Sequence, residues 1–124
     1  MSHNIKSNNM NILFVCSANE DRSPTAERLY ANHPEHPGLK VKSAGTSDYA
    51  RARLSKTVLQ WADVIICMER QHQRFIEDKY SDIVANKVID HLNIWDIYPY
   101  MHPNLQKEIR EKMDAWLREY QQNQ

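Results

Sequence analysis

The sequence of 124 residues has few cysteines and no long apolar run. Its two cysteines, Cys16 and Cys67, are too few for a disulfide framework, and their spacing fits no C-x-x-C zinc or redox pattern. Apolar runs such as residues 64–68 are far too short to cross a bilayer, and the polar N-terminus lacks the apolar segment of a signal peptide. These absences favour a protein of the reducing cytoplasm with no membrane partner.

An excess of charge of either sign is also lacking, because 16 basic residues balance 16 acidic ones. A neutral chain does not have the basic footprint of a duplex-binding protein, so no nucleic-acid partner is expected. The apolar content of 41% is ordinary for a folded domain. We expect one domain over residues 11–124, preceded by a flexible tail over residues 1–10, which are rich in Asn and Ser and show no periodicity.

Apolar segments of strand length alternate along the chain with segments of helical periodicity. Strands are expected at residues 11–16, 39–44, 63–68 and 87–92, and helices at residues 23–32, 54–62, 69–80 and 103–122. Phe75 and Ile76 are expected to face inward from the third of these helices. This alternation predicts an α/β fold in which helices cover both faces of a four-stranded parallel sheet, as three layers.

The segment that follows the first expected strand carries the clearest chemical signal. Cys16 ends the strand, and Arg22 follows six positions later at the expected helix start. Ligands of open α/β sheets bind at the carboxyl ends of the strands, where a tight loop and a helix N-terminus offer N–H donors to an anion. A thiol in such surroundings ionises readily, and the thiolate is a nucleophile. Arg22 supplies a planar fork of donors that fits two phosphoryl oxygens.

A phosphate-binding loop is therefore predicted between the first strand and the first helix, and Ser23 is placed to donate a hydrogen bond to the thiolate. Two residues at this spacing arise often by chance, but the strand before them, the helix after them and Ser23 favour the functional interpretation. The residues expected to surround the phosphate are Ser17, Ala18, Asn19, Glu20, Asp21, Arg22 and Ser23.

With these residues in place, the sequence resembles the low-molecular-weight protein tyrosine phosphatase family, as a short and divergent member. The resemblance rests on LFVCSANEDRSPTAE at residues 13–27, on SAGT at residues 43–46 and on ADVIICME at residues 62–69. It implies that Cys16 attacks the phosphate, that Arg22 binds it and that Asn19 shapes the loop.

The family's general acid lies in an Asp-Pro-Tyr loop after the fourth strand. The resemblance assigns that role to Asp96, in a segment that reads Asp-Ile-Tyr and lacks the proline. Protonation of the leaving oxygen requires a carboxylic acid within hydrogen-bonding reach. Asp90, the main rival, lies inside an expected strand. Trp95 is assigned to packing, and the aromatic walls of the substrate pocket are expected to be Tyr98, Tyr100 and Tyr49.

The sequence departs from the family pattern at several positions. Asp21 stands where family members often carry a second cysteine, and the side chains of Glu20 and Asp21 are expected to point outward. No equivalent of the family's loop-supporting histidine is assigned, and His72 is interpreted as a surface residue of a helix. No metal site is assigned, because the remaining histidines considered lack metal-ligand spacing: His33, His36, His91 and His102.

The resemblance implies a cytoplasmic phosphatase that needs no cofactor and acts on a phosphotyrosine protein or a small aryl phosphate. The oligomeric state is left open. Two alternatives remain: a phosphate- or phosphoprotein-binding module without turnover, and an enzyme like the arsenate reductases. A relay through three cysteines is excluded, because Cys67 is the one thiol besides Cys16.

Overall fold

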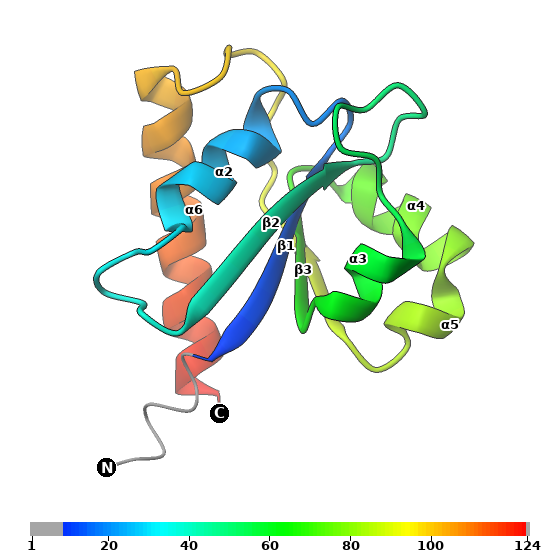
Figure 1. Cartoon of the computed structure of the whole chain (residues 1–124). Coiled ribbons are helices and arrows are strands. Elements are labelled where there is room, and N and C mark those ends of the chain that lie inside the picture. The colour runs from blue at the N-terminus through cyan, green and yellow to red at the C-terminus, as the bar shows by residue number, and fades with distance from the viewer. Residues whose placement is uncertain (1–8, 124) are drawn as a thin grey trace.

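Four parallel strands form the central sheet of the computed structural model, which describes residues 9–123 (Figure 1). The strands are β1 (Met10–Cys16), β2 (Leu39–Gly45), β3 (Val64–Cys67) and β4 (Val88–His91). They lie in the order β2-β1-β3-β4, with every pairing parallel. The apolar run that ends at Cys16 therefore forms an interior strand, as expected for a strand that is buried on both faces.

Helices cover both faces of the sheet, which confirms the predicted three-layer α/β/α fold. On one face lie α2 (Arg22–Tyr30) and α6 (Pro103–Gln122), and on the other α3 (Lys56–Trp61), α4 (Arg70–Lys79) and the short α5 (Ser81–Val84). Successive side chains of a strand point to opposite faces. Ile12, Phe14 and Cys16 thus join the apolar cluster under α2 and α6, whereas Leu13 and Val15 join the cluster under α3 and α4.

The elements differ from their expected bounds mainly at their ends. The expected tail lies largely outside the described residues, and Met10 already belongs to β1. Helix α5 was not predicted, because four residues are too few for a periodic pattern. The inward orientation predicted for Phe75 is wrong: its side chain is 36% exposed and lies beside Lys79, whereas Ile76 is fully buried.

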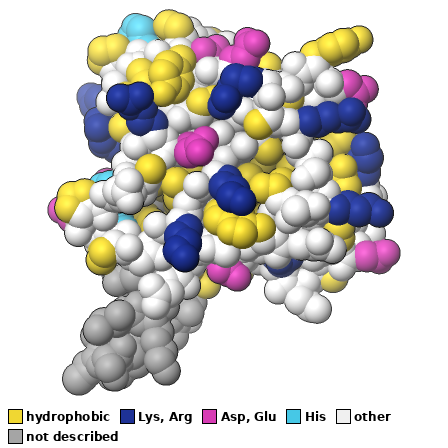
Figure 2. Space-filling view, in the orientation of Figure 1, with side chains coloured by type: hydrophobic (Ala, Val, Ile, Leu, Met, Phe, Trp, Pro, Cys, Tyr) yellow, Lys and Arg dark blue, Asp and Glu magenta, His cyan; other side chains and the backbone are white. Residues whose placement is uncertain are grey.

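The parallel sheet gives the molecule two different ends. The carboxyl ends of the strands meet at one end, where the loops after β1, β2, β3 and β4 gather, whereas the start of β1 and the end of α6 lie at the opposite end (Figure 1). Charges of both signs are scattered over the face shown in Figure 2. Within residues 9–123, no helix combines the length and the apolar character that a bilayer crossing requires.

Candidate active site

The loop after β1 is fixed by hydrogen bonds that its carbonyl groups accept from the segment after β2. The carbonyls of Cys16, Ser17 and Ala18 accept N–H bonds from Thr46, Ser47 and Arg51, each at 3.0 Å. In a trans peptide unit the N–H points away from the carbonyl. These peptide units therefore turn their donors toward the other side of the loop, as a nest for an anion requires.

Two residues with special backbone requirements shape this loop. Asn19 has a φ of 56°, in the left-handed region that asparagine tolerates better than most residues. Gly45 lies directly behind the loop, where a Cβ atom would stand 2.5 Å from the carbonyl oxygen of Ser17. Only a residue without a side chain fits at position 45, so the SAGT segment packs against the nucleophile loop through its glycine.

A chain of hydrogen bonds orients the hydroxyl group that faces Cys16. The Asn19 side-chain amide donates to Ser23 Oγ and to Ser43 Oγ, each at 2.9 Å, and Ser43 in turn donates to Glu27. Ser23 Oγ accepts from Asn19, and its own proton faces two acceptors, the Cys16 sulfur at 2.9 Å and the Ala44 carbonyl at 3.4 Å. The predicted contact between Ser23 and Cys16 is therefore present.

The guanidinium of Arg22 is buried and held by groups from two other loops. Its Nη1 forms an ion pair with Glu69 and donates to the carbonyl of Ile94 at 2.8 Å, while its Nε lies 3.8 Å from Asp96. Arg22 is 2% exposed, so the surrounding protein fixes its position closely. Sequence reasoning placed Arg22 in the loop but assigned no role to Glu69.

The interpretation of His72 as a surface residue is wrong, because its ring is buried behind the loop. Its Nδ1 accepts the backbone N–H of Glu69 at 3.0 Å, so in the neutral ring Nε2 carries the proton and donates to Ser17 Oγ at 2.9 Å. Burial and the Arg22 charge lower the pKa of His72 to about 4, against the opposing charges of Glu69 and Asp96. A histidine that supports the nucleophile loop, which could not be assigned from the sequence, is therefore present at the start of α4.

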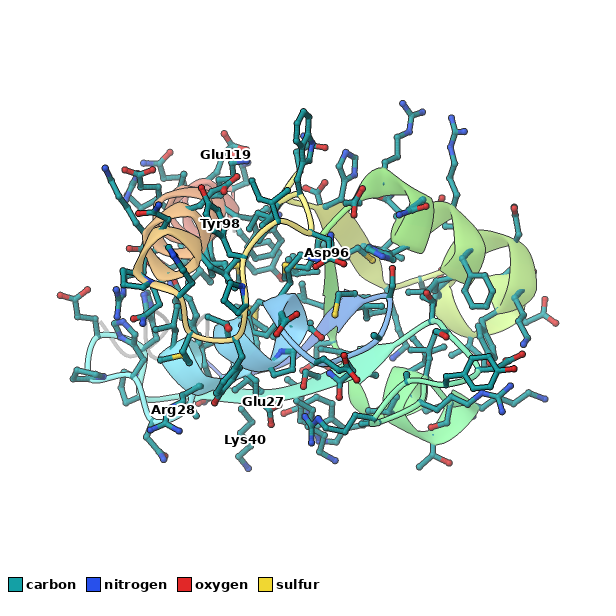
Figure 3. The ribbon with its side chains drawn as sticks, turned by 90° about the horizontal axis from the view of Figure 1, so that it is seen from above. Glu27, Arg28, Lys40, Asp96, Tyr98 and Glu119 are labelled. Atoms are coloured by element: carbon teal, nitrogen blue, oxygen red, sulfur yellow. The ribbon has the colours of Figure 1, made fainter. Side chains whose placement is uncertain are left out.

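Asp96 reaches the site on the loop between β4 and α6. Figure 3 shows Asp96 and Tyr98 on this loop, with Tyr98 lying over α6. Asp96 thus lies around one small hollow with Cys16, the last residue of β1, and Arg22, the first residue of α2. Trp95 is 69% exposed, which contradicts its assignment to packing.

The three tyrosines expected as pocket walls have different surroundings. Tyr100 lines a hollow of about 370 Å³ that shares Glu20 with the hollow at Cys16. Tyr98 packs against the core and stacks on His102 with ring centroids 4.8 Å apart. Tyr49 is 94% exposed and lines neither hollow. Of the three, Tyr100 is placed to touch a substrate near Cys16.

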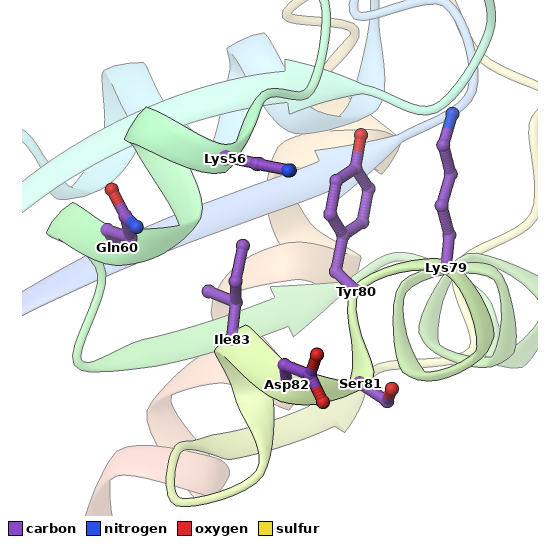
Figure 4. A pocket seen from close by; sticks show the side chains of 7 residues that line it. All are labelled: Lys56, Gln60, Lys79, Tyr80, Ser81, Asp82 and Ile83. Carbon is purple, nitrogen blue, oxygen red and sulfur yellow. The ribbon is translucent and has the colours of Figure 1, made fainter.

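The hollow at Cys16 is small, about 50 Å³, and combines a nucleophile with charged groups. It is lined by Cys16, Ala18, Glu20, Asp21, Arg22 and Asp96. Glu20 is exposed, as expected, but the Asp21 carboxylate does not simply point outward, because it accepts the backbone N–H of Tyr100 at 2.8 Å. A larger hollow of about 280 Å³ lies between α3 and α5, where Lys56, Tyr80 and Lys79 stand near one another (Figure 4). That hollow contains no cysteine or histidine.

One group of side chains in residues 9–123 has the composition of a metal site. His33, Glu35 and His36 bring their ligand atoms within 4.8 Å of one another on the loop between α2 and β2. This loop lies before β2, at the end of the sheet opposite Cys16. The cluster could hold a metal ion, but it contributes nothing to the site at Cys16.

The sequence and the fold are both similar to those of known phosphatases. A family model described as "Low molecular weight phosphotyrosine protein phosphatase" matches residues 11–60. A protein-arginine-phosphatase of Bacillus subtilis is 27% identical over 96 residues, which cover 58% of this chain and 64% of that protein. The tyrosine phosphatase Wzb of Escherichia coli is 63% identical over 35 residues, or 28% of this chain and 22% of its own length. The chain thus spans less than two thirds of these curated relatives.

Solved structures extend the similarity over nearly the whole chain. The YwlE arginine phosphatase of Geobacillus stearothermophilus superposes with a TM-score of 0.70 at 23% identity, covering 93% of this chain and 95% of that one. A low molecular weight protein tyrosine phosphatase of Streptococcus pyogenes also gives 0.70, at 17% identity, covering 89% and 92%. The predicted resemblance is confirmed: residues 11–60 are similar in sequence to the low-molecular-weight phosphotyrosine protein phosphatases, and the chain shares the fold of these enzymes.

Proposed function

We propose that this chain is a cysteine-dependent phosphatase that hydrolyses phosphomonoesters through a cysteinyl-phosphate intermediate. The observation that carries the proposal is the hollow in which the Cys16 sulfur, oriented by Ser23, faces the same space as Arg22 and Asp96. A nucleophile, an anion-binding group and a carboxyl group are the three components that this reaction needs.

The first half-reaction transfers the phosphoryl group to sulfur. The Cys16 thiolate attacks phosphorus, and the bond from phosphorus to the leaving oxygen breaks as Asp96 donates its proton to that oxygen. The loop N–H groups and Arg22 bind the phosphoryl oxygens, and Arg22 is prepared for this because Glu69 and Ile94 already hold its Nη1. Such pre-placed donors stabilise the transition state without having to reorient during the reaction.

The second half-reaction releases phosphate. Asp96, now ionised, takes a proton from a water molecule that attacks phosphorus, and the sulfur–phosphorus bond breaks. The Ser23 hydroxyl donates its hydrogen bond to the departing thiolate, which its distance of 2.9 Å from the sulfur allows. The site thereby returns to its starting protonation state, and the net reaction consumes one water molecule.

Protein phosphotyrosine is the expected substrate, since exposed apolar side chains form a rim on the loop that carries Asp96. Trp95, Ile97 and Tyr100 are all exposed on the loop that carries Asp96, at 69%, 63% and 44%. An aromatic ring attached to the phosphate would pack against such a rim.

Protein phosphoarginine is a second candidate, and one observation favours it. Three carboxylates, those of Glu20, Asp21 and Asp96, line the hollow around the nucleophile. A negative rim attracts a cationic guanidinium leaving group more than a neutral phenol ring. Two of the curated relatives are named as protein-arginine-phosphatases.

A substrate panel with three forms of the protein tests these proposals. Wild type, Cys16→Ser and Asp96→Asn are compared on phosphotyrosine, phosphoserine and phosphoarginine peptides and on a small aryl phosphate. We expect turnover by wild type, none by Cys16→Ser, and a loss of about 10²- to 10⁴-fold in Asp96→Asn when the leaving group is poor.

Each alternative has its own outcome in this panel. Phosphate binding without turnover by wild type would support the binding-module alternative, whereas turnover of arsenate with a thiol reductant would support the reductase. Turnover that survives Cys16→Ser contradicts the proposed mechanism. An unchanged rate in Asp96→Asn shows that another group supplies the proton.

A further inference from the structure

Asp21 connects the nucleophile loop to the loop that carries Asp96. Its carboxylate accepts the backbone N–H of Tyr100 at 2.8 Å, across 79 positions of the sequence. Asp21 stands at the N-cap of α2, where an aspartate ordinarily accepts N–H bonds from the first turn of its own helix. Here its side chain makes no such capping bond, so the carboxylate serves the other loop instead of the helix.

A second connection lies next to the first. The Thr25 hydroxyl donates to the Asp21 carbonyl at 2.6 Å and accepts the N–H of Met101 at 2.9 Å. Met101 has a φ of 61°, a conformation that non-glycine residues rarely adopt unless their surroundings hold them there. Two consecutive backbone N–H groups, those of Tyr100 and Met101, are thus bound by the start of α2.

The opposite end of the Asp96 loop is held by other elements. The N–H of Ile94 donates to the Met68 carbonyl at 2.8 Å, and the Ile94 carbonyl accepts from Arg22. Between the two fixed ends lies Asp96, which is 61% exposed at its side chain and meets Arg22 Nε at 3.8 Å. Its position over Cys16 therefore depends on how both ends of the loop are held.

We infer that Asp21 is a positioning residue, whose carboxylate holds the Asp96 loop over the Cys16 hollow. The inference rests on the proposed function, in which Asp96 gives its proton to the leaving oxygen. A small displacement of a proton donor lowers the rate strongly, because the donor must reach the leaving oxygen at hydrogen-bonding distance. Loss of the Asp21 acceptor leaves Thr25 as the remaining bond from α2 to that end of the loop.

The negative charge of Asp21 and its role as an acceptor have separable effects. Asn at position 21 keeps a side-chain oxygen that can accept the Tyr100 N–H but removes a charge beside the bound dianion. Ala removes both. Asp21→Asn is therefore expected to lower KM while keeping most of kcat, whereas Asp21→Ala is expected to lower kcat.

Kinetics with leaving groups of different acidity measure the positioning effect. For Asp21→Ala we expect kcat to fall about 10- to 100-fold with an alkyl or weakly acidic aryl leaving group, and much less with a strongly acidic phenol that departs without a proton. Asp21→Asn should recover most of the loss. Asp78→Ala, which removes an exposed carboxylate of α4, is the control for charge alone. An equal loss with both leaving groups overturns the inference.

Amide hydrogen exchange tests whether Asp21 restrains the Tyr100 end of the Asp96 loop. This measurement does not depend on turnover of any substrate. In Asp21→Ala the N–H groups of Tyr100 and Met101 should exchange at least about 10-fold faster than in wild type, while those of β1 and β3 stay unchanged. Unchanged exchange at Tyr100 overturns the inference even if wild type is an active phosphatase. Faster exchange in Asp21→Ala, together with a wild type that has no phosphatase activity, supports the positioning role of Asp21 and rejects the proposed function instead.

Discussion

Cys16 and Cys67 lie near each other on neighbouring strands but in opposite surroundings. Cys67 is paired in register with Val15, and Cys16 is the next residue along β1, so the two thiols point to opposite faces of the sheet. Cys16 ends its strand beside the Ser23 hydroxyl, whereas Cys67 is buried among apolar side chains, and this burial raises the pKa of its thiol. The comparison teaches that position at the end of a strand, rather than residue type, makes a cysteine a candidate nucleophile.

The same substitution at both positions should give opposite results, and this is the largest effect expected. Cys16→Ser should lower kcat by at least about 10³-fold and change stability little, because the serine hydroxyl keeps a hydrogen bond to Ser23. Cys67→Ser should keep kcat but lower the free energy of unfolding by about 1–3 kcal/mol, since it buries a hydroxyl among apolar side chains. Steady-state kinetics and urea unfolding of both variants measure the contrast.

Equal losses of activity in the two variants would break the comparison. It would also fail if Cys16→Ser unfolded more easily than Cys67→Ser.

The region around Cys16 also differs from that around Cys67 because it holds a buried histidine, His72, against its loop. His72→Gln tests how much this histidine contributes to stability. The pKa of His72 is about 4 in the folded chain against 6.5 for an unperturbed histidine, so the unfolded chain takes up a proton first as the pH falls. Stability from this group is present above pH 6.5 and decreases toward pH 4, by about 3 kcal/mol in all, at about 1.4 kcal/mol per pH unit.

Denaturant unfolding of wild type and His72→Gln at several pH values measures this difference. The variant should lose less stability than wild type between pH 6.5 and pH 4. Its glutamine retains a donor for Ser17, so the loop should stay in place. Parallel pH profiles for the two proteins would show that folding does not lower the pKa of His72.

Peroxide should produce the smallest structural change, namely oxidation at one thiol without a cross-link. Cys16 lines a hollow and should oxidise first, whereas Cys67 is 0% exposed and has a raised pKa, so it should remain reduced in the folded chain. Peptide mass spectrometry after peroxide treatment reports both sites. A bond between Cys16 and Cys67 would contradict the placement of the two thiols on opposite faces of the sheet.

Most of the fold could be predicted because its strands and helices have strong local patterns. The apolar run that ends at Cys16 and the helical stripe of α6 were each located to within one residue. The orientation of Phe75 could not be predicted in this way, because consecutive residues of a helix point in different directions, and Ile76 is the one of the pair that joins the apolar cluster.

The candidate site was predictable where its residues are consecutive and less so where they come together through the fold. Cys16, Ser23 and Arg22 could be proposed from one segment, but the partners of that segment lie on other elements. Glu69 and His72 form a capping box at the start of α4, in which the Glu69 side chain and the His72 ring each accept a backbone N–H. The contacts of this pair with Arg22 and Ser17 arise only because the end of β3 lies beside β1.

The start of β1 and the end of α6 lie at the same end of the molecule (Figure 1), which has a practical consequence. The start of β1 and the end of α6 both lie at the end of the molecule away from the carboxyl end of β1, where Cys16 stands (Figure 1). A surface linker or a fluorescent label attached through either end would therefore leave the Cys16 hollow facing the solution. Attachment at either point therefore suits binding measurements on phosphorylated peptides.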